Sequence, residues 1–237
     1  MKKIILGVLV FMMLMPLEAV FANTEITSTK EVIRRRQLIQ NVGYKLLNAN
    51  RIDKRMIFAY AHNKKEANAY ACGRYRTITV TKGMMDNIDS EDELAAVIGH
   101  EISHQLDHYK GIFKGYFSFT VFKPQARREE IKADLRSIDF LVNAGYNPVA
   151  SIIIFNKMLN QPRYEWYLSH PLGSRRLAKA YEYIYVKYPY FLVNNEYIKN
   201  PVYQNFLLTS KENRLKLKDA LEEAKTENKP LKQPKYN

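Results

Sequence analysis

The sequence reads EDELAAVIGHEISH over residues 91–104, and this stretch predicts one amphipathic helix. Ser90 stands at the expected N-cap position, and Glu93 three residues later completes a capping box. Apolar residues recur at helical spacing within the stretch, at Leu94, Val97, Ile98 and Ile102. We therefore expect a helix that begins next to Ser90 and buries one of its faces.

The last five of these residues have the form H-E-x-x-H. Because residues four apart lie one above the other on a helix, His100 and His104 can bind one metal ion together. Glu101 lies about 100° round the helix axis, within reach of a water molecule beside that ion. Zinc accepts such ligands, so the pattern predicts a catalytic site with one Zn²⁺ per chain. The alternative is a surface helix with two histidines, since H-E-x-x-H arises by chance in roughly one chain in a hundred of this length.

A catalytic zinc site needs a third protein ligand, and the next predicted helix supplies the acidic candidates Glu129, Glu130 and Asp134. Glu130 and Asp134 are four residues apart and share one helix face, whereas Glu129 points about 100° away from Glu130. Metal binding by Glu130 and orientation of an imidazole by Asp134 are consistent with this spacing. The alternative is a solvated polar face.

The composition indicates a folded domain, because 46% of the 237 residues are hydrophobic and 26% are charged. The single cysteine, Cys72, excludes an intramolecular disulfide, and a small buried side chain is its ordinary interpretation. The net charge of +13 is compatible with two interpretations, peripheral contact with a membrane or another anionic envelope surface, and a basic surface kept for solubility. No nucleic-acid-binding motif is found, so we expect no nucleic-acid partner.

The first 22 residues read as a secretory signal. Lys2 and Lys3 precede an apolar run from Ile4 to Met15 that is too short to span a bilayer comfortably. We expect cleavage after Ala22 and a periplasmic or extracellular protein. The alternative is an uncleaved membrane anchor.

Periodicity predicts further elements along the chain. Alternating residues predict strands at 55–62 and 75–81, and helical spacing recurs at residues 30–50, 127–144, from 148 onward and at 174–187. Thr209 and Glu212 suggest a capping box for a charged helix that reaches about residue 227, and the last ten residues are expected to fray. An aromatic cluster within residues 109–126 indicates either a hydrophobic lid or core packing. Tyr181 and Tyr185 have two interpretations, a peptide-binding platform or ordinary packing on a half-buried helix.

Several segments resemble, in order, the zinc peptidases related to HtpX, the CAAX prenyl endopeptidase and the BepA-type proteases. The likeness covers roughly residues 32–187. It is carried by EDELAAVIGHEISH, by the E-x-x-A-D form of Glu130 to Asp134, and by four further segments: Asn68 to Ala71, Thr77 to Met85, Ala144 to Pro148, and His170-Pro171 followed by Arg176.

This resemblance implies a mainly helical α+β metalloprotease fold with a small antiparallel or mixed sheet. It implies zinc held by His100, His104 and Glu130, with Glu101 as general base and Asp134 as support. It further implies His170 near the oxyanion and Arg176 as a second supporting residue. Substrate is expected to add a strand alongside residues 75–81, at Thr77, Ile78, Thr79 and Val80. Unlike the named relatives, the chain shows no run of transmembrane helices and no helical-repeat domain.

These observations predict an exported zinc metalloendopeptidase that acts on unfolded or extended polypeptides in envelope protein quality control. The metallopeptidase domain is expected at residues 23–208, followed by a charged C-terminal helix and tail at 209–237. One alternative is a zinc-dependent chaperone or assembly factor with little proteolysis, although such a protein has no need of Glu101. Another is a basic adhesion protein of the cell envelope.

Overall fold

The computed structural model describes residues 17–109, 123–158 and 173–236, and within these stretches the side chains of residues 17–28 and 123–127 are left out. Contacts divide the chain into two compact units, residues 1–38 and 39–237. Helix α2 (Leu17–Ala49) supplies the described part of the first unit and continues into the second. Among the described residues, no helix has both the length and the apolar character needed to cross a membrane. Residues 1–16 of the predicted signal segment lie outside the description.

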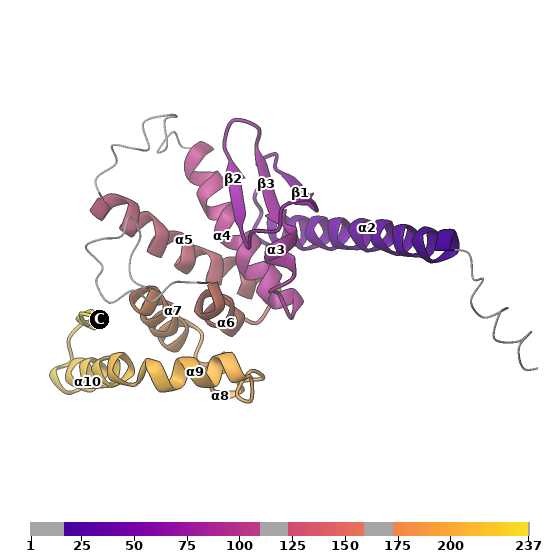
Figure 1. Ribbon diagram of the computed structural model, residues 1–237. Helices are drawn as coiled ribbons and strands as arrows, with labels where there is room; N and C mark the ends of the chain where they lie inside the picture. Colours follow the sequence, from indigo (N-terminus) through magenta and orange to yellow (C-terminus); the bar gives the residue numbers. More distant parts are fainter. Residues whose placement is uncertain (1–16, 110–122, 159–172, 237) are drawn as a thin grey trace, which may run out of the picture. The chain divides into compact units, whose positions relative to one another are not determined.

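The second unit contains a small mixed sheet of three strands, β1 (Ile57–Ala61), β2 (Ala69–Cys72) and β3 (Thr77–Thr81) (Figure 1). Their spatial order is β1-β3-β2, with β3 parallel to β1 and antiparallel to β2. Ile78 and Val80 alternate with threonines and are fully buried, as the period of a half-buried strand requires.

The sheet order corrects the predicted substrate strand. Thr77, Ile78, Thr79 and Val80 lie in the central strand, where β1 and β2 already occupy both edges, so no further strand can pair with them. The edge strand that packs on helix α4 is β2. Sequence alternation identified β3 correctly as a strand but carries no information about which strand lies at the edge.

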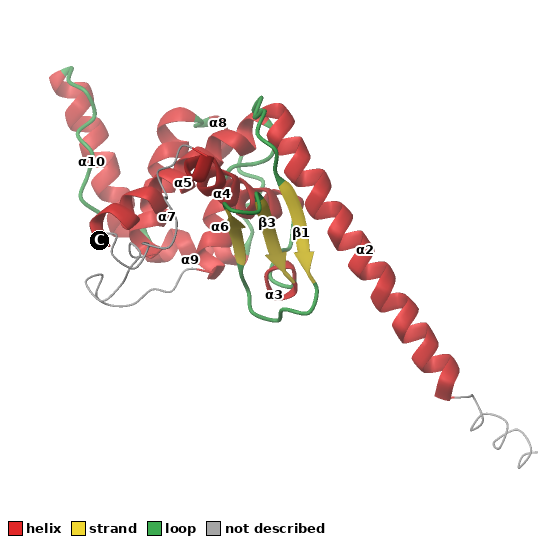
Figure 2. Cartoon of the chain, turned by 90° about the horizontal axis from the view of Figure 1, so that it is seen from above, coloured by secondary structure: helices red, strands yellow, loops and turns green. Residues whose placement is uncertain are grey.

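Helices make up the rest of the second unit, and they cover one side of the sheet (Figures 1 and 2). Helix α4 is central, because it packs against α5, α6 and both β2 and β3. The helices in chain order are α3 (Lys82–Met85), α4 (Glu91–Tyr109), α5 (Lys123–Asn143), α6 (Val149–Met158), α7 (Gly173–Lys187), α8 (Tyr190–Val193), α9 (Pro201–Thr209) and α10 (Lys211–Glu227).

The start of α4 follows the predicted capping box closely. The backbone N–H of Glu93 donates to Ser90 Oγ at 3.2 Å, while the Glu93 carboxylate accepts from the N–H of Asp89 rather than Ser90. Lys157 of α6 also contacts the Glu93 carboxylate at 2.7 Å. The backbone N–H groups of Glu93 and Asp89, which have no partner in the helix itself, and the buried Glu93 carboxylate all form hydrogen bonds here. The register of α4 is therefore well defined at its first turn.

The C-terminal segment differs from expectation in two respects. Thr209 ends α9 and donates to the carbonyl of Asn205, and Ser210 precedes α10 without a side-chain cap, so the predicted capping box is wrong. The tail returns to α7, where Tyr236 is 4% exposed and its carbonyl accepts from Arg175 Nε. The described part of the tail is therefore packed at Tyr236, because an aromatic ring there finds an apolar site formed with Ala178 and Leu217.

Candidate metal centre

Close packing of α4 against α5 brings the two halves of the site together. A Cβ atom at Gly99 would lie 3.3 Å from both Leu141 Cδ1 and Ser137 Cβ of α5, closer than ordinary contact. The absence of a side chain at Gly99 thus lets the helices approach directly beside His100. The acidic face of α5 consequently lies opposite the histidines of α4.

Three ligand atoms converge at this contact. The Nε2 atoms of His100 and His104 are 3.0 Å apart, and the Glu130 carboxylate oxygens lie 3.4 Å from His104 Nε2 and 3.7 Å from His100 Nε2. Metal–ligand bonds of about 2.0–2.1 Å in a tetrahedron place ligand atoms about 3.4 Å apart, so the three distances fit zinc. Within the described stretches, these three residues form the group of His, Cys, Asp and Glu side chains that could hold a metal ion.

The carboxylate of Glu130 is held in its charged form. Burial alone would raise the pKa, but hydrogen bonding to His104 and the nearby charges of His100 and Arg176 outweigh it and set the pKa of Glu130 at about 2. Glu129, in contrast, pairs with Lys132 at 3.0 Å and does not join the cluster. The structure thus places Glu130 beside the two histidines and Glu129 away from them, as helix geometry requires.

Asp134 and Arg176 form a buried layer behind the ligands. Arg176 donates from Nε and Nη2 to the two Asp134 oxygens at 2.7 and 2.6 Å, and its Nη1 lies 3.2 Å from Glu130 Oε2. Asp134 Oδ1 lies 2.9 Å from His100 Nδ1, close enough to bond, although the approach is not well aligned. Burial alone would raise the pKa of Asp134, but the charge and hydrogen bonds of Arg176, with a smaller contribution from nearby His100, outweigh it and lower the pKa, so the carboxylate stays ionised.

Glu101 is not one of the three converging residues, but it interacts electrostatically with all of them. Burial raises the pKa of its carboxylate, and the charges of His100 and His104 and a hydrogen bond donated by the backbone N–H of Ala71 only partly offset this. Glu101 therefore sits beside both the ligand cluster and the edge strand β2. A carboxylate with a raised pKa is suited to accept and return a proton near neutral pH.

A cavity of about 220 Å³ opens beside Glu101. One wall is formed by His100 and Glu101, and the other residues are mainly apolar: Ala67, Asn68 and Ala69 from the β2 segment, Met84 from α3, Val97 from α4, and Ile154, Phe155 and Met158 from α6. Sequence reasoning missed this lining, because residues of α3 and α6 have the ordinary apolar pattern of a core.

Phe155 of the cavity lining also contacts the site itself, which sequence reasoning did not predict. Its ring centroid lies 6.0 Å from that of His100 in an edge-to-face arrangement, and the guanidinium of Arg176 lies 5.5 Å from the same ring. Phe155 therefore limits the movement of both groups. His170, the other predicted catalytic residue, lies outside the described residues.

Part of the chain matches the model of a known protein family. The model of peptidase family M48 matches residues 33–113, a segment that contains α4 with His100, Glu101 and His104 and ends before α5. No curated protein matches the chain. The matched segment and the mainly helical fold with a three-stranded mixed sheet agree with the predicted resemblance and fold class. Residues 33–113 are therefore similar to peptidase family M48, and this likeness supports a metallopeptidase.

Proposed function

We propose that this metallopeptidase binds one zinc ion through His100, His104 and Glu130 and cleaves extended polypeptides outside the cytoplasm. The observation that carries the proposal is the position of Glu101. Its carboxylate lies next to the converging histidines and accepts a hydrogen bond from the edge strand where a peptide can pair.

Bound zinc would polarise the scissile carbonyl and favour deprotonation of the attacking water. Glu101 accepts the proton of that water and passes it to the leaving amine. The raised pKa of Glu101 brings its proton affinity closer to that of the groups it serves. Asp134 and Arg176 keep His100 and Glu130 in place, since His100 contacts Asp134 and Glu130 contacts Arg176.

The open edge of β2 supports recognition of an extended main chain. Asn68 exchanges hydrogen bonds with Thr81 on the β3 side, through its carbonyl and its N–H. Because neighbouring residues of a strand point to opposite sides, Ala69 and Ala71 face away from β3, and Ala71 indeed donates to Glu101. Substrate is therefore proposed to pair with Ala69 and with the carbonyl of Ala71 rather than with β3.

The cavity beside Glu101 supports a preference for an apolar side chain next to the scissile bond. A cavity of about 150 Å³ already admits benzene, so one of about 220 Å³ has room for a leucine, methionine or phenylalanine side chain. Among the described residues that line it, none is a lysine or arginine, and Glu101 is the one carboxylate. Selection by one apolar pocket and by main-chain pairing suits broad cleavage of unfolded chains.

Export and a role in envelope protein quality control belong to the same proposal. They are supported by the signal-like composition of residues 1–22 and by the open strand edge, which favours unfolded substrates over folded ones. Donation by His170 to the oxyanion is supported by the resemblance of His170-Pro171 to the family pattern.

The test is cleavage of casein by the purified, zinc-loaded chain, compared with Glu101→Gln, Glu130→Gln and a chelator-treated sample. Glu129→Gln is the matched control, because Glu129 is adjacent on α5 but pairs with Lys132 outside the cluster. We expect cleavage by the native chain and by Glu129→Gln alone. Glu101→Gln should retain stoichiometric zinc, whereas Glu130→Gln should bind it more weakly.

Two results would contradict the proposal. Full cleavage by Glu101→Gln would remove the general base from the mechanism. Stoichiometric zinc binding without cleavage by the native chain, combined with capture of unfolded casein, would favour the chaperone alternative.

A further inference from the structure

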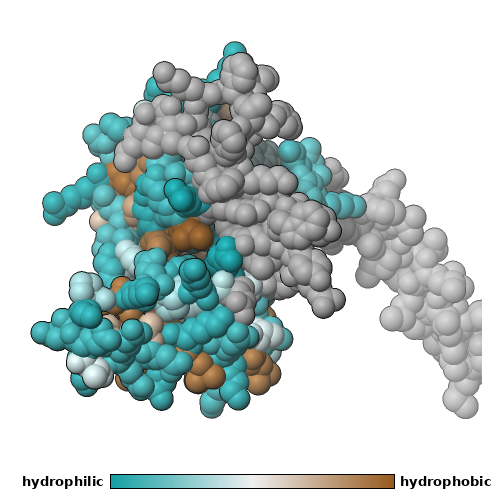
Figure 3. All heavy atoms as spheres, turned by 90° about the vertical axis from the view of Figure 1, so that its left-hand side faces the viewer, coloured by the Kyte–Doolittle hydropathy of each residue, from teal (hydrophilic) through white to brown (hydrophobic). Residues whose placement is uncertain are grey.

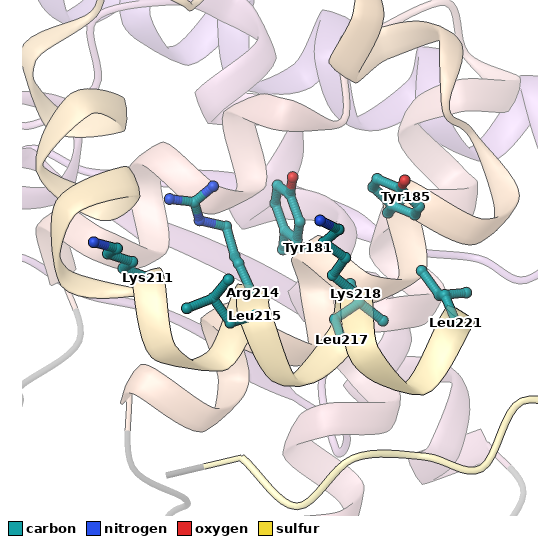
Figure 4. Close-up of a pocket in the computed structure, with 8 residues that line it drawn as sticks. All are labelled: Tyr181, Tyr185, Lys211, Arg214, Leu215, Leu217, Lys218 and Leu221. Carbon is teal, nitrogen blue, oxygen red and sulfur yellow. The ribbon is translucent and has the colours of Figure 1, made fainter. Parts of the chain in front are cut away.

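A second cavity, of about 390 Å³, lies between α7 and α10, away from the ligand cluster (Figure 4). None of its lining residues is a metal ligand or contacts Glu101. Tyr181 and Tyr185 from α7 form one wall. The other wall consists of residues of α10, namely Lys211, Arg214, Leu215, Leu217, Lys218 and Leu221.

The charge of this groove is not compensated by its own lining, which contains three cations and no carboxylate. Arg214 is held by neutral acceptors, since it donates to Ser210 Oγ at 3.2 Å, to the carbonyl of Leu207 at 2.7 Å and to the hydroxyl of Tyr181. Within the described residues, neither Arg214 nor Lys211 forms an ion pair, whereas Lys218 lies 3.7 Å from Glu222 on the same helix. A half-buried guanidinium oriented in this way is prepared to receive an anion.

The groove also offers apolar surface. Leu215 and Tyr185 are 50% and 45% exposed, and Leu217 and Leu221 complete the apolar part of the lining. A ligand that satisfies both features must carry a negative charge and a bulky apolar group close together. The volume exceeds the roughly 150 Å³ that benzene requires and has room for about two side chains.

The charges of α10 favour a short ligand over an extended anionic surface. Its first half carries Lys211, Arg214, Lys216 and Lys218 against Glu212, whereas its second half carries Asp219, Glu222, Glu223 and Glu227 against Lys225. A bilayer with anionic headgroups would meet both halves and be repelled by the second. Apart from the grey atoms, the face in Figure 3 is mostly hydrophilic, with separate hydrophobic areas.

We propose that the groove between α7 and α10 is an exosite for polypeptides, which binds a short segment containing an acidic residue next to an apolar one. The carboxylate meets Arg214 and Lys211, and the apolar side chain fills the space between Tyr185 and Leu221. This interpretation extends one of the two readings of Tyr181 and Tyr185, a platform for peptides. It goes beyond the proposed peptidase activity, and binding at this groove does not depend on Glu101.

The experiment measures fluorescence anisotropy of labelled twelve-residue peptides with the zinc-loaded full chain carrying Glu101→Gln, so that the probe stays intact. One peptide combines glutamates with leucine and phenylalanine, and its counterpart has lysine in place of each glutamate. We expect the acidic peptide to bind and the basic one to bind at least tenfold more weakly. Arg214→Gln should weaken binding of the acidic peptide on the order of tenfold.

The matched control is Lys216→Gln, because Lys216 lies on the same helix but pairs with Glu212 at 3.0 Å and does not line the groove. It should bind like the parent chain. Lys211→Gln and Leu215→Ala, both at exposed positions, should each weaken binding and provide a test even if Arg214→Gln is unstable.

Equal binding of the two peptides, or equal weakening by Lys216→Gln, would overturn the exosite. Binding to phosphatidylglycerol vesicles that depends on Arg214, without binding of the acidic peptide, would overturn it in favour of a lipid surface. Cleavage of casein by the Lys211→Gln chain is measured in a separate assay. A loss of peptidase activity can therefore be distinguished from a loss of peptide binding at the exosite.

Discussion

At the scale of single residues, the site depends on buried charges that neutralise one another. Arg176 contacts two carboxylates. It donates two hydrogen bonds to Asp134, and it pairs with Glu130, a proposed metal ligand. The pair is nearly excluded from water, with Asp134 1% and Arg176 5% exposed. Removal of one partner would leave a buried charge without compensation, which is far more costly than loss of a surface ion pair.

We therefore expect Arg176→Ala to destabilise the chain by about 3–5 kcal/mol and to weaken zinc binding by about 10–100-fold. Urea unfolding and zinc titration measure the two effects. Arg175→Ala is the control, because Arg175 is the adjacent residue and its side chain contacts the carbonyl of Tyr236 instead of the two carboxylates. Unchanged zinc affinity in Arg176→Ala would show that Arg176 supports the fold alone.

At the scale of secondary-structure elements, the direction in which each residue of β2 faces decides where substrate can pair. The N–H of Ala69 faces the open edge, whereas that of Tyr70 faces β3. Proline at an outward-facing position of an edge strand removes no ladder hydrogen bond.

We expect Ala69→Pro to leave the melting temperature nearly unchanged and to raise KM for an extended peptide several-fold. Tyr70→Pro, one residue further, should lower the melting temperature clearly because it removes a bond to β3. Peptide kinetics and thermal unfolding of both variants provide the comparison. Identical effects of the two substitutions would contradict the proposed pairing edge.

At the scale of the whole molecule, the contact of α4 with α5 contributes to stability as well as to the site. Asp107 of α4 is 1% exposed and bonds Lys132 and Arg136 of α5, each at 3.1 Å. Burial raises the pKa of Asp107, but these two cations outweigh it, so the pKa lies below the usual value of 3.8. The stabilisation is therefore present above the unfolded-state pKa and is lost as the pH falls through the lower pKa of the folded chain.

Asp107→Asn should lower the free energy of unfolding at pH 7, and it should reduce the further loss of stability between pH 5 and pH 3. Denaturant unfolding at several pH values tests this. The control is Asp219→Asn on the exposed face of α10, which should leave the pH profile unchanged. Parallel pH profiles for the native chain and Asp107→Asn would contradict the assignment of this carboxylate to acid unfolding.

The sequence by itself determined what depends on neighbours along the chain. The N-terminal cap of α4, its buried face and the shared face of His100 and His104 follow from a period of 3.6 residues, and the structure has each of them. The likeness to peptidase family M48 could be recognised partly for the same reason, since its H-E-x-x-H pattern lies within one continuous helix. The φ of +75° at Gly145, which directly follows the helix predicted at residues 127–144, is likewise a local property.

Only the tertiary structure decided what depends on segments that are distant in the chain. β2 was missed as a strand because four residues with two alanines show no clear alternation, and its edge position emerges only from pairing with β3. The convergence of Glu130 on the histidines, the contact of Phe155 with His100, and the groove between α7 and α10 likewise arise from packing. Periodicity states which face of an element is buried, whereas packing alone determines what lies against it.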